Sequence, residues 1–520
     1  MIVSAQYETF KQMRSHKTKQ LSAVTISAAI CAGIISCKDQ KETENNTQTL
    51  PNIVYILADD LGYGDVKINN NESKIPTPNI DQLAGEGIRF TDGHSPAQIC
   101  APSRYSILTG RYYWRNEIYQ EIGWRVVSPW AEPMIEEDRL TLPQMLGDLG
   151  YHTACIGKWH LGFDWIVKEG GKKGGTYRDL DYTAKVKGGP LTRGFDYFFG
   201  IDRPNGSVAF IEDEWHTEIP SQKPANPILA SFADKTPVGW TFEKIKPTLT
   251  QKAIDYIEDR SNSDSAFFLY YALTGPHTPI APDSNYIGKS QAGRYGDFVY
   301  QIDSDVGRIV ETLKKQGVYE NTVIIFSSDN GSPEMDGTNY FGPLKSVFRY
   351  GHYPNTPWRG MKADLWEGGH RVPLIVRWPG VTTPNTVSEV TVSQIDFMRT
   401  FANFFDYELP EDAAEDSYDI MSALRGEKTA GHDPLILYNS EIPTIRSGKW
   451  KLILDKGPTG FSRRAGYEPR DDAPDWQLYN MESDPREQNN LFEERQDVVK
   501  ELEKMLNAYI IRPSNSFFNN

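Results

Sequence analysis

Cysteine is scarce in this chain, since only four of its 520 residues are cysteines. Cys31 and Cys37 lie near the N-terminus, which leaves Cys100 and Cys155 for the rest of the sequence. Two cysteines do not make a disulfide framework, so the sequence argues against a small disulfide-stabilised fold. Cys155 lies in the apolar stretch His152 to Ile156 and is interpreted as a buried strand residue, whereas Cys100 requires another explanation.

Basic charge is outnumbered by acidic charge. The chain has 55 Lys and Arg residues against 70 Asp and Glu residues, which gives a formal net charge of −15 at pH 7. This balance argues against nonspecific nucleic-acid binding, so no nucleic-acid partner is predicted. An anionic substrate would need a local cluster of Lys, Arg and His side chains.

Long apolar runs are lacking, apart from one near the N-terminus. The run from Leu21 to Ser36 follows several basic residues; it is too short to span a bilayer but has the proportions of a signal peptide. Its end, Ile34-Ile35-Ser36-Cys37, resembles the lipobox of bacterial lipoproteins, in which the cysteine becomes the lipidated first residue. We predict a lipoprotein signal peptide over 1–36, a lipid anchor to the membrane at Cys37 and a tether over 37–50. The protein would then be an exported outer-membrane lipoprotein that faces the periplasm or the cell surface; an ordinary cleaved signal peptide is the alternative.

Short apolar runs rich in β-branched residues recur along the chain and end in Gly, Asp or Asn. They are typical of buried parallel strands. The predicted strands are Asn52 to Ala58, Thr153 to Ile156, Phe267 to Leu273 and Thr322 to Phe326. Helices are predicted between them. The segment Pro78 to Glu86 is framed by Thr77 and Gly87 as capping residues, and in the segment Phe298 to Lys315 apolar residues recur at helical spacing. Strands that alternate with helices predict an α/β fold with a large, mostly parallel sheet flanked by helices.

A turn-rich stretch near residues 425 to 435 predicts a domain boundary. We predict a catalytic domain over 51–430 and a smaller C-terminal subdomain over 431–520. The second part contains three strand-like runs followed by a helix with one apolar face, which predicts an α+β subdomain. The strand-like runs are Leu435 to Asn439, Trp450 to Leu454 and Trp476 to Tyr479.

Titratable or metal-binding residues follow each predicted strand of the large sheet. In chain order these are Asp59-Asp60, Gly157-Lys158 with His160, Gly275-Pro276-His277 and Asp329-Asn330-Gly331. Because ligands bind beyond the carboxyl ends of parallel strands, we expect these side chains to converge. Each pair also has a plainer interpretation: Asp59-Asp60 as a turn or helix cap, and Asp329-Asn330-Gly331 as a tight turn. Alternation along a strand would place Lys158 and His160 on the same side.

Cys100 begins a predicted helix that has Pro102 in its first turn and Gly110 after its last. A helix N-terminus offers free backbone N–H groups and the positive end of the helix dipole, so it favours an anion there. A cysteine at a helix start is, by itself, more often a buried structural residue.

The segment Cys100-Ala101-Pro102-Ser103-Arg104, followed by Leu108-Thr109-Gly110-Arg111, resembles the signature of the type I formylglycine-dependent sulfatases. Further segments between residues 51 and 380 are similar to motifs of the same family, among them Gly157 to Gly162, Gly275 to Pro279, Gly360-Met361-Lys362 and Trp366 to Pro373. The resemblance implies an alkaline phosphatase-like fold with an antiparallel sheet in the C-terminal subdomain. It also implies that a formylglycine-generating or anaerobic sulfatase-maturating enzyme converts Cys100 to formylglycine, whose hydrate offers two hydroxyls on one carbon.

The same resemblance implies roles for single residues. Carboxylate and amide oxygens would bind a metal together with modified Cys100, from Asp59, Asp60, Asp329 and Asn330. Oxygen ligands without His or thiolate suit Ca²⁺, and Mg²⁺ less well. Arg104 would hold modified Cys100, and Lys158 and Lys362 would bind the sulfate oxygens. His160 would act as the base that collapses the intermediate, and His277 would bind the substrate and protonate the leaving alcohol.

The resemblance predicts a sulfuric ester hydrolase, and exported members of the family suggest a sulfated carbohydrate as substrate. We hypothesise oligosaccharides of a marine algal polysaccharide such as ulvan, carrageenan or fucan. Two alternatives are a phosphodiesterase or phosphonate monoester hydrolase of the same superfamily, and a noncatalytic glycan-binding lipoprotein.

Overall fold

The computed structural model of the chain describes residues 50–121, 132–172, 177–439 and 442–511. The predicted signal peptide, the tether apart from residue 50, and Cys37 lie outside the described residues. No helix among the described residues is both long and apolar enough to cross a membrane. The described residues form one compact unit, which contains all of the elements named below.

A ten-stranded sheet forms the centre of this unit, in the order β11-β2-β10-β9-β1-β8-β4-β5-β6-β7. The strands from β9 to β5 in this order are parallel to their neighbours. Their bounds are β9 Thr322–Ser328, β1 Asn52–Asp59, β8 Phe267–Pro276, β4 His152–Lys158 and β5 Tyr197–Ile201. All four predicted strands are therefore present as neighbours, and the predicted α/β fold with a mostly parallel sheet is confirmed.

Short strands complete the two edges of the large sheet, mainly through antiparallel pairing. They are β2 Ile88–Phe90, β10 Leu374–Arg377 and β11 Thr386–Ser388 on one side, and β6 Ile211–Glu212 and β7 Trp215–His216 on the other. β3 Gly93–His94 and β12 Val392–Ser393 form a separate parallel pair. None of these short strands was predicted, because two to four residues carry too little periodic signal.

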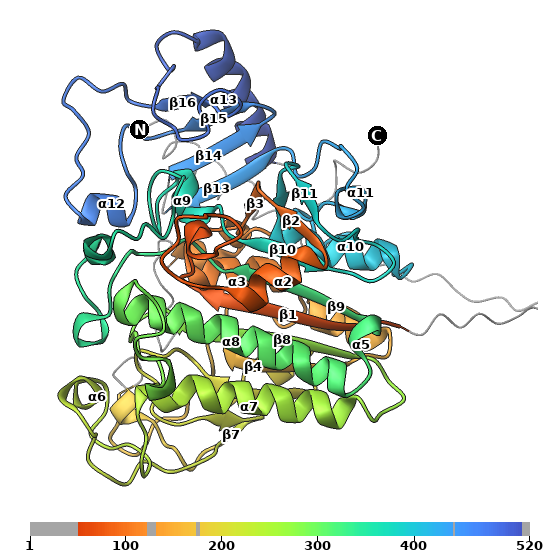
Figure 1. Cartoon of the computed structure of the whole chain (residues 1–520), viewed down its shortest axis with the longest axis vertical. Helices are drawn as coiled ribbons and strands as arrows, with labels where there is room; N and C mark the ends of the chain where they lie inside the picture. The colour runs from red at the N-terminus through yellow and green to blue at the C-terminus, as the bar shows by residue number, and fades with distance from the viewer. Residues whose placement is uncertain (1–49, 122–131, 173–176, 440–441, 512–520) are drawn as a thin grey trace, which may run out of the picture. The chain divides into compact units, whose positions relative to one another are not determined.

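Helices cover both faces of the sheet, and β1 shows why. Its alternate side chains Tyr55 and Ile56 belong to different apolar clusters, one on each face. On one face lie α2 Pro78–Gly85, α7 Phe242–Arg260 and α8 Gly293–Lys315, and Figure 1 shows α7 and α8 running side by side. On the other face lie α3 Cys100–Thr109, α5 Leu142–Asp148 and α10 Phe397–Phe404. The remaining helices are α4 Glu117–Glu121, α6 Pro227–Phe232, α9 Glu367–His370, α11 Met421–Leu424, α12 Phe461–Arg464 and α13 Gln496–Ile511.

A four-stranded antiparallel sheet follows in the C-terminal part. Its strands are β13 Leu435–Asn439, β14 Ile442–Ser447, β15 Trp450–Ile453 and β16 Gln477–Asn480, and α13 packs on it. The predicted antiparallel sheet is present, with β14 added to the three predicted strands. The described residues form a single compact unit by their contacts, so a domain boundary at 430 stays a prediction.

Candidate active site

The carboxyl ends of the central strands bring the predicted residues to one edge of the sheet. Asp59 closes β1 and Lys158 closes β4, while His277 follows β8 and Asp329 follows β9. Because these four strands are parallel neighbours, their ends lie at the same edge. One ligand atom each from Asp59, Cys100 and Asp329 lies within 4.8 Å of the others, and the same holds for Asp59, Asp60 and His277.

Cys100 and Arg104 reach this edge from one turn of α3. The helix begins at Cys100 and ends before Gly110, whose φ of 63° is left-handed, as the sequence predicted. Residues four apart lie on the same side of a helix, so the spacing of Cys100 and Arg104 directs both side chains to the strand ends. Burial raises the pKa of the Cys100 thiol, so the unmodified side chain is a neutral thiol and a poor nucleophile at neutral pH.

Arg104 fixes the position of Asp329. Its Nε and Nη2 donate to Asp329 Oδ2 at 3.0 and 2.8 Å, and its Nη1 donates to the Lys158 carbonyl oxygen at 2.9 Å. Both side chains are fully buried. Burial, followed by the nearby charge of Asp59, raises the pKa of Asp329 to about 6. Arg104 therefore joins α3 to the ends of β4 and β9.

Two lysines contact the carboxylates of the aspartate pair. Lys158 Nζ lies 2.9 and 2.8 Å from the two carboxylate oxygens of Asp59, and Lys362 Nζ donates to Asp60 Oδ1. Burial by itself would raise the pKa of Asp59, but the Lys158 ammonium and its neighbours hold it well below its usual range. Lys362 therefore joins its loop to the aspartate pair at the ends of the strands.

Two histidines also lie near these charged groups. His160 follows β4 with a left-handed φ of 58°, so the expected strand alternation with Lys158 is wrong: the strand ends at Lys158. Neither ring nitrogen of buried His160 has a hydrogen-bond partner among the described residues. Burial and then the charge of Lys158 lower its pKa well below the usual range, which keeps the imidazole neutral. His277 Nε2 lies 3.8 Å from Asp60 Oδ2, and burial lowers the pKa of His277 to about 4.

The donor set fits a hard divalent cation. Asp59, Asp60 and Asp329 supply carboxylate oxygens, and Asn330 Nδ2 donates to Asp60 Oδ1 at 2.6 Å. Asn330 Oδ1 is buried and lacks a hydrogen-bond partner within the described part of the chain. A buried amide oxygen without a donor is costly unless a ligand supplies the missing interaction. Oxygen ligands of this kind are those that Ca²⁺ takes, with Mg²⁺ next.

Arg203 lies beside this site and was not predicted from the sequence. It follows β5, its Nε lies 3.1 Å from Asp202 Oδ2, and Asp202 also accepts from the Tyr177 hydroxyl at 2.6 Å. The charge of Arg203 is among the influences that lower the pKa of His160. Asp202 and Arg203 follow a parallel strand, as the other site residues do, so recognising β5 would have revealed them.

These features define a class of protein. A cysteine at a helix N-terminus, oxygen donors that fit a divalent cation and the cationic side chains of Arg104, Lys158 and Lys362 lie at the carboxyl edge of a parallel sheet. This is the arrangement of a hydrolase that acts on anionic esters.

Comparison with known proteins identifies the family. A family model described as Sulfatase matches residues 51–407. An N-acetylgalactosamine-6-O-sulfatase of Bacteroides thetaiotaomicron is 33% identical over 512 residues and covers 91% of this chain and 95% of its own. An N-acetylgalactosamine-6-sulfatase of Mus musculus is 32% identical over 412 residues, with 78% and 72% covered. A solved sulfatase structure from work on glycosaminoglycan metabolism by Bacteroides thetaiotaomicron has a TM-score of 0.74 at 29% identity, covering 89% of this chain and 100% of that chain. The chain belongs to the sulfatase family and is a sulfuric ester hydrolase.

Proposed function

We propose that this sulfatase removes a 6-O-sulfate from an N-acetylgalactosamine-type sugar of a sulfated polysaccharide, with Cys100 converted to formylglycine and Ca²⁺ bound by Asp59, Asp60, Asp329 and Asn330. The observation that carries the proposal is the closeness of Cys100 to Asp59 and Asp329, with their ligand atoms within 4.8 Å of one another. When formed, formylglycine supplies a hydrated aldehyde with two hydroxyls, one for attack and one for later release of sulfate. A bound divalent cation supplies polarisation of the sulfate oxygens.

The charges of the site favour a bound anion once a divalent cation is present. Three buried carboxylates, from Asp59, Asp60 and Asp329, face three buried cations, from Arg104, Lys158 and Lys362. These formal charges cancel in the protein alone. A divalent cation therefore leaves a net positive site in a low-dielectric surrounding, where a sulfate monoester anion is attracted strongly.

The remaining roles follow from the positions of the side chains. Lys158 and Lys362 carry ammonium groups that bind sulfate oxygens. His160 has a neutral imidazole with both ring nitrogens unpaired among the described residues, so it would accept the proton from a hydroxyl of the formylglycine hydrate formed at Cys100. His277, next to Asp60, donates a proton to the oxygen of the leaving alcohol.

The substrate class rests on the relatives. Two relatives at least 32% identical are named as sulfatases for the 6-position of N-acetylgalactosamine. This favours a primary sulfate on an amino sugar over the algal polymers expected from the sequence, which serve here as the competing substrates. We also propose that the protein is exported, lipidated at Cys37 and matured by a formylglycine-generating or anaerobic sulfatase-maturating enzyme. Incorporation of a labelled fatty acid by the native chain, and its loss in Cys37→Ala, tests the anchor.

Two measurements test the proposed activity. The tryptic peptide that contains Cys100 should be lighter than the unmodified peptide by about 18 Da, because an aldehyde replaces the thiol. The purified enzyme should release sulfate from 6-sulfated N-acetylgalactosamine faster than from 4-sulfated N-acetylgalactosamine, neocarrageenan oligosaccharides or an aryl phosphodiester. Cys100→Ala should abolish turnover, and Cys155→Ala, a change at the other cysteine among the described residues, should retain it. An unmodified but active Cys100, or a preference for the phosphodiester, would overturn the proposal.

A further inference from the structure

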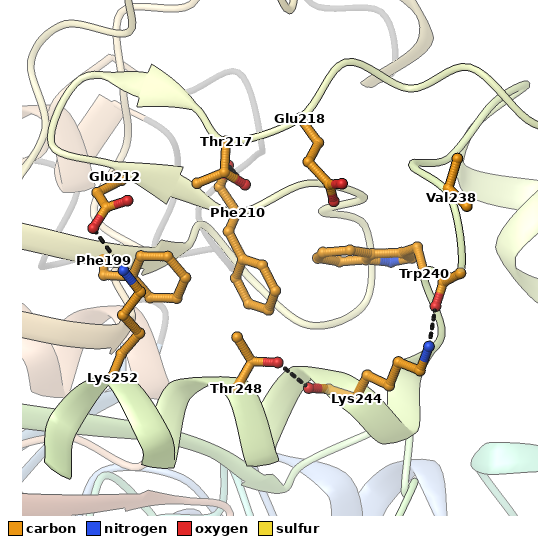
Figure 2. A pocket seen from close by; sticks show the side chains of 11 residues that line it. Phe199, Phe210, Glu212, Thr217, Glu218, Val238, Trp240, Lys244, Thr248 and Lys252 are labelled. Atoms are coloured by element: carbon orange, nitrogen blue, oxygen red, sulfur yellow. Dashed lines mark hydrogen bonds and ion pairs between the residues drawn. The ribbon is translucent and has the colours of Figure 1, made fainter. Parts of the chain in front are cut away.

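A hollow away from the candidate active site lies between the sheet edge formed by β5, β6 and β7 and the N-terminal half of α7. Its volume is about 410 Å³, and Figure 2 shows side chains converging on it from the hairpin above and from α7 below. None of the residues proposed above for sulfate chemistry lines it. The lining includes aromatic, hydroxyl and carboxylate side chains, from Phe199, Phe210, Trp240, Thr217, Thr248 and Glu218.

Aromatic rings form the floor of the hollow. The rings of Phe199 and Phe210 stack with centroids 5.1 Å apart, and Phe210 meets Trp240 at 4.8 Å. Phe199 and Trp240 are buried, so these rings are held in place by packing. The indole Nε1 of Trp240 has no hydrogen-bond partner in the part of the chain that the structure describes, which leaves an unused donor in the floor.

The rim is polar but carries no excess charge. Lys252 Nζ pairs with Glu212 at 2.8 Å, and Lys244 Nζ donates to the carbonyl oxygen of Gly239 at 2.9 Å. Glu218 balances Lys244 and, in Figure 2, holds its carboxylate above the indole of Trp240. The rim therefore offers both donors and acceptors, and its paired charges favour a neutral ligand over a sulfated one.

Exposed apolar side chains extend this surface. Trp215 is 53% exposed, Ile219 59% and Val238 67%, and Val238 lines the hollow itself. Trp215 on β7 pairs across the hairpin with Glu212 on β6. Side chains of directly paired residues lie on the same face of a sheet, so the indole of Trp215 lies on the face of Glu212, beside the hollow. Exposed apolar groups gathered around a concave site mark a ligand surface.

We propose that this hollow binds a neutral pyranose ring of the polysaccharide and so holds the polymer while the strand-end site acts elsewhere on it. The volume lies within the range of small-ligand sites, whereas a protein partner would need an interface of roughly 1,000 Å² or more. Aromatic faces pack against the apolar C–H face of a pyranose, and a rim of carboxylate, hydroxyl and ammonium groups bonds its hydroxyls. The proposal rests on the proposed function only for the identity of the polymer.

Polymer binding without turnover gives the test. Cys100→Ala protein is run through native gels that contain chondroitin 6-sulfate, which carries 6-sulfated N-acetylgalactosamine, or the same polymer after chemical desulfation. Trp215→Ala removes the exposed indole, and Thr248→Trp fills the hollow from α7. Tyr353→Ala is the matched control, because Tyr353 is 52% exposed and lies outside the hollow. Each variant is also made with Cys100 intact and assayed on a small sulfated monosaccharide.

Trp215→Ala and Thr248→Trp should both weaken retention by roughly five-fold in the gel with the desulfated polymer, whose N-acetylgalactosamine rings are neutral, because five-fold is the scale of one lost aromatic contact. Tyr353→Ala should not, and turnover of the monosaccharide should stay unchanged in all three variants. Equal retention of the two hollow variants and the control would overturn the proposal, as would a loss confined to the sulfated polymer. Loss of retention in a protein that proves inactive on every sulfate ester would still support the hollow and would contradict only the proposed function.

Discussion

Replacing Arg104 by lysine should weaken divalent-cation binding, although Arg104 is not itself a ligand. The guanidinium donates three hydrogen bonds in a fixed fork, two to Asp329 Oδ2 and one to the carbonyl oxygen of Lys158. A lysine ammonium keeps the charge but not the fork, so it retains one of the three. Loss of two bonds with a charged donor corresponds to about 3 to 6 kcal/mol of stability in a buried site. Asp329 then loses its fixed orientation. Changing a residue that orients a metal ligand typically lowers metal affinity by about 10- to 100-fold, so we expect a loss of calcium affinity of this size.

Calcium titration calorimetry of chelator-treated protein measures this affinity, and urea unfolding measures the stability. Arg115→Lys is the matched control, because Arg115 makes a similar fork with Asp416, through Nε to Oδ2 at 2.8 Å and Nη2 to Oδ1 at 2.9 Å. Both variants should lose stability, but only Arg104→Lys should lose calcium affinity. If the two variants bind calcium equally well, the positioning role of Arg104 is refuted.

Three further predictions concern the cation and two sites remote from it. Removing calcium with a chelator should lower the unfolding temperature, since 100-fold saturation of a folded-state site is worth about 2.7 kcal/mol; an unchanged temperature would argue against a resident cation. Lys451→Met should lower the free energy of unfolding by about 3 to 5 kcal/mol, because Lys451 Nζ lies 2.9 Å from a carboxylate oxygen of Glu367 and 2.7 Å from one of Glu487, and all three side chains are fully buried. The double variant with Glu487→Gln removes one of the two carboxylates left without a partner, so it should recover part of this loss in urea unfolding. Burial lowers the pKa of His216 from 6.5 to about 4, so the unfolded chain binds more protons between these values and stability falls by about 3 kcal/mol as the pH drops through them. His216→Phe should flatten that part of the pH profile, and an unchanged slope would contradict the assignment.

Local features of the site follow from the sequence. The four-residue step from Cys100 to Arg104 is one helical turn, so α3 places both side chains on one face wherever the helix packs. β1 contains the continuous apolar run Ile53 to Ala58 and β9 the run Val323 to Phe326, and runs of four to six such residues are typical of buried strands. The positions of Asp59 and Asp329 at the ends of these strands could therefore be predicted from the sequence. Two-residue strands such as β6 could not, because their pairing depends on neighbours far away in the chain.

Which residues become partners was decided only by the tertiary structure. Lys158 lies 99 positions from Asp59, and its ion pair with Asp59 depends on β8 lying between β1 and β4 in the sheet. The direction of the His160 side chain likewise depends on where β4 ends, because the chain leaves the strand at Lys158 and His160 adopts a left-handed φ. Backbone geometry acts over a few residues, so the sequence alone determined helices, strands and the residue types at their ends. Sheet order and loop approach depend on burying distant apolar faces together, so the fold determined the contacts of Lys158, Lys362 and His160.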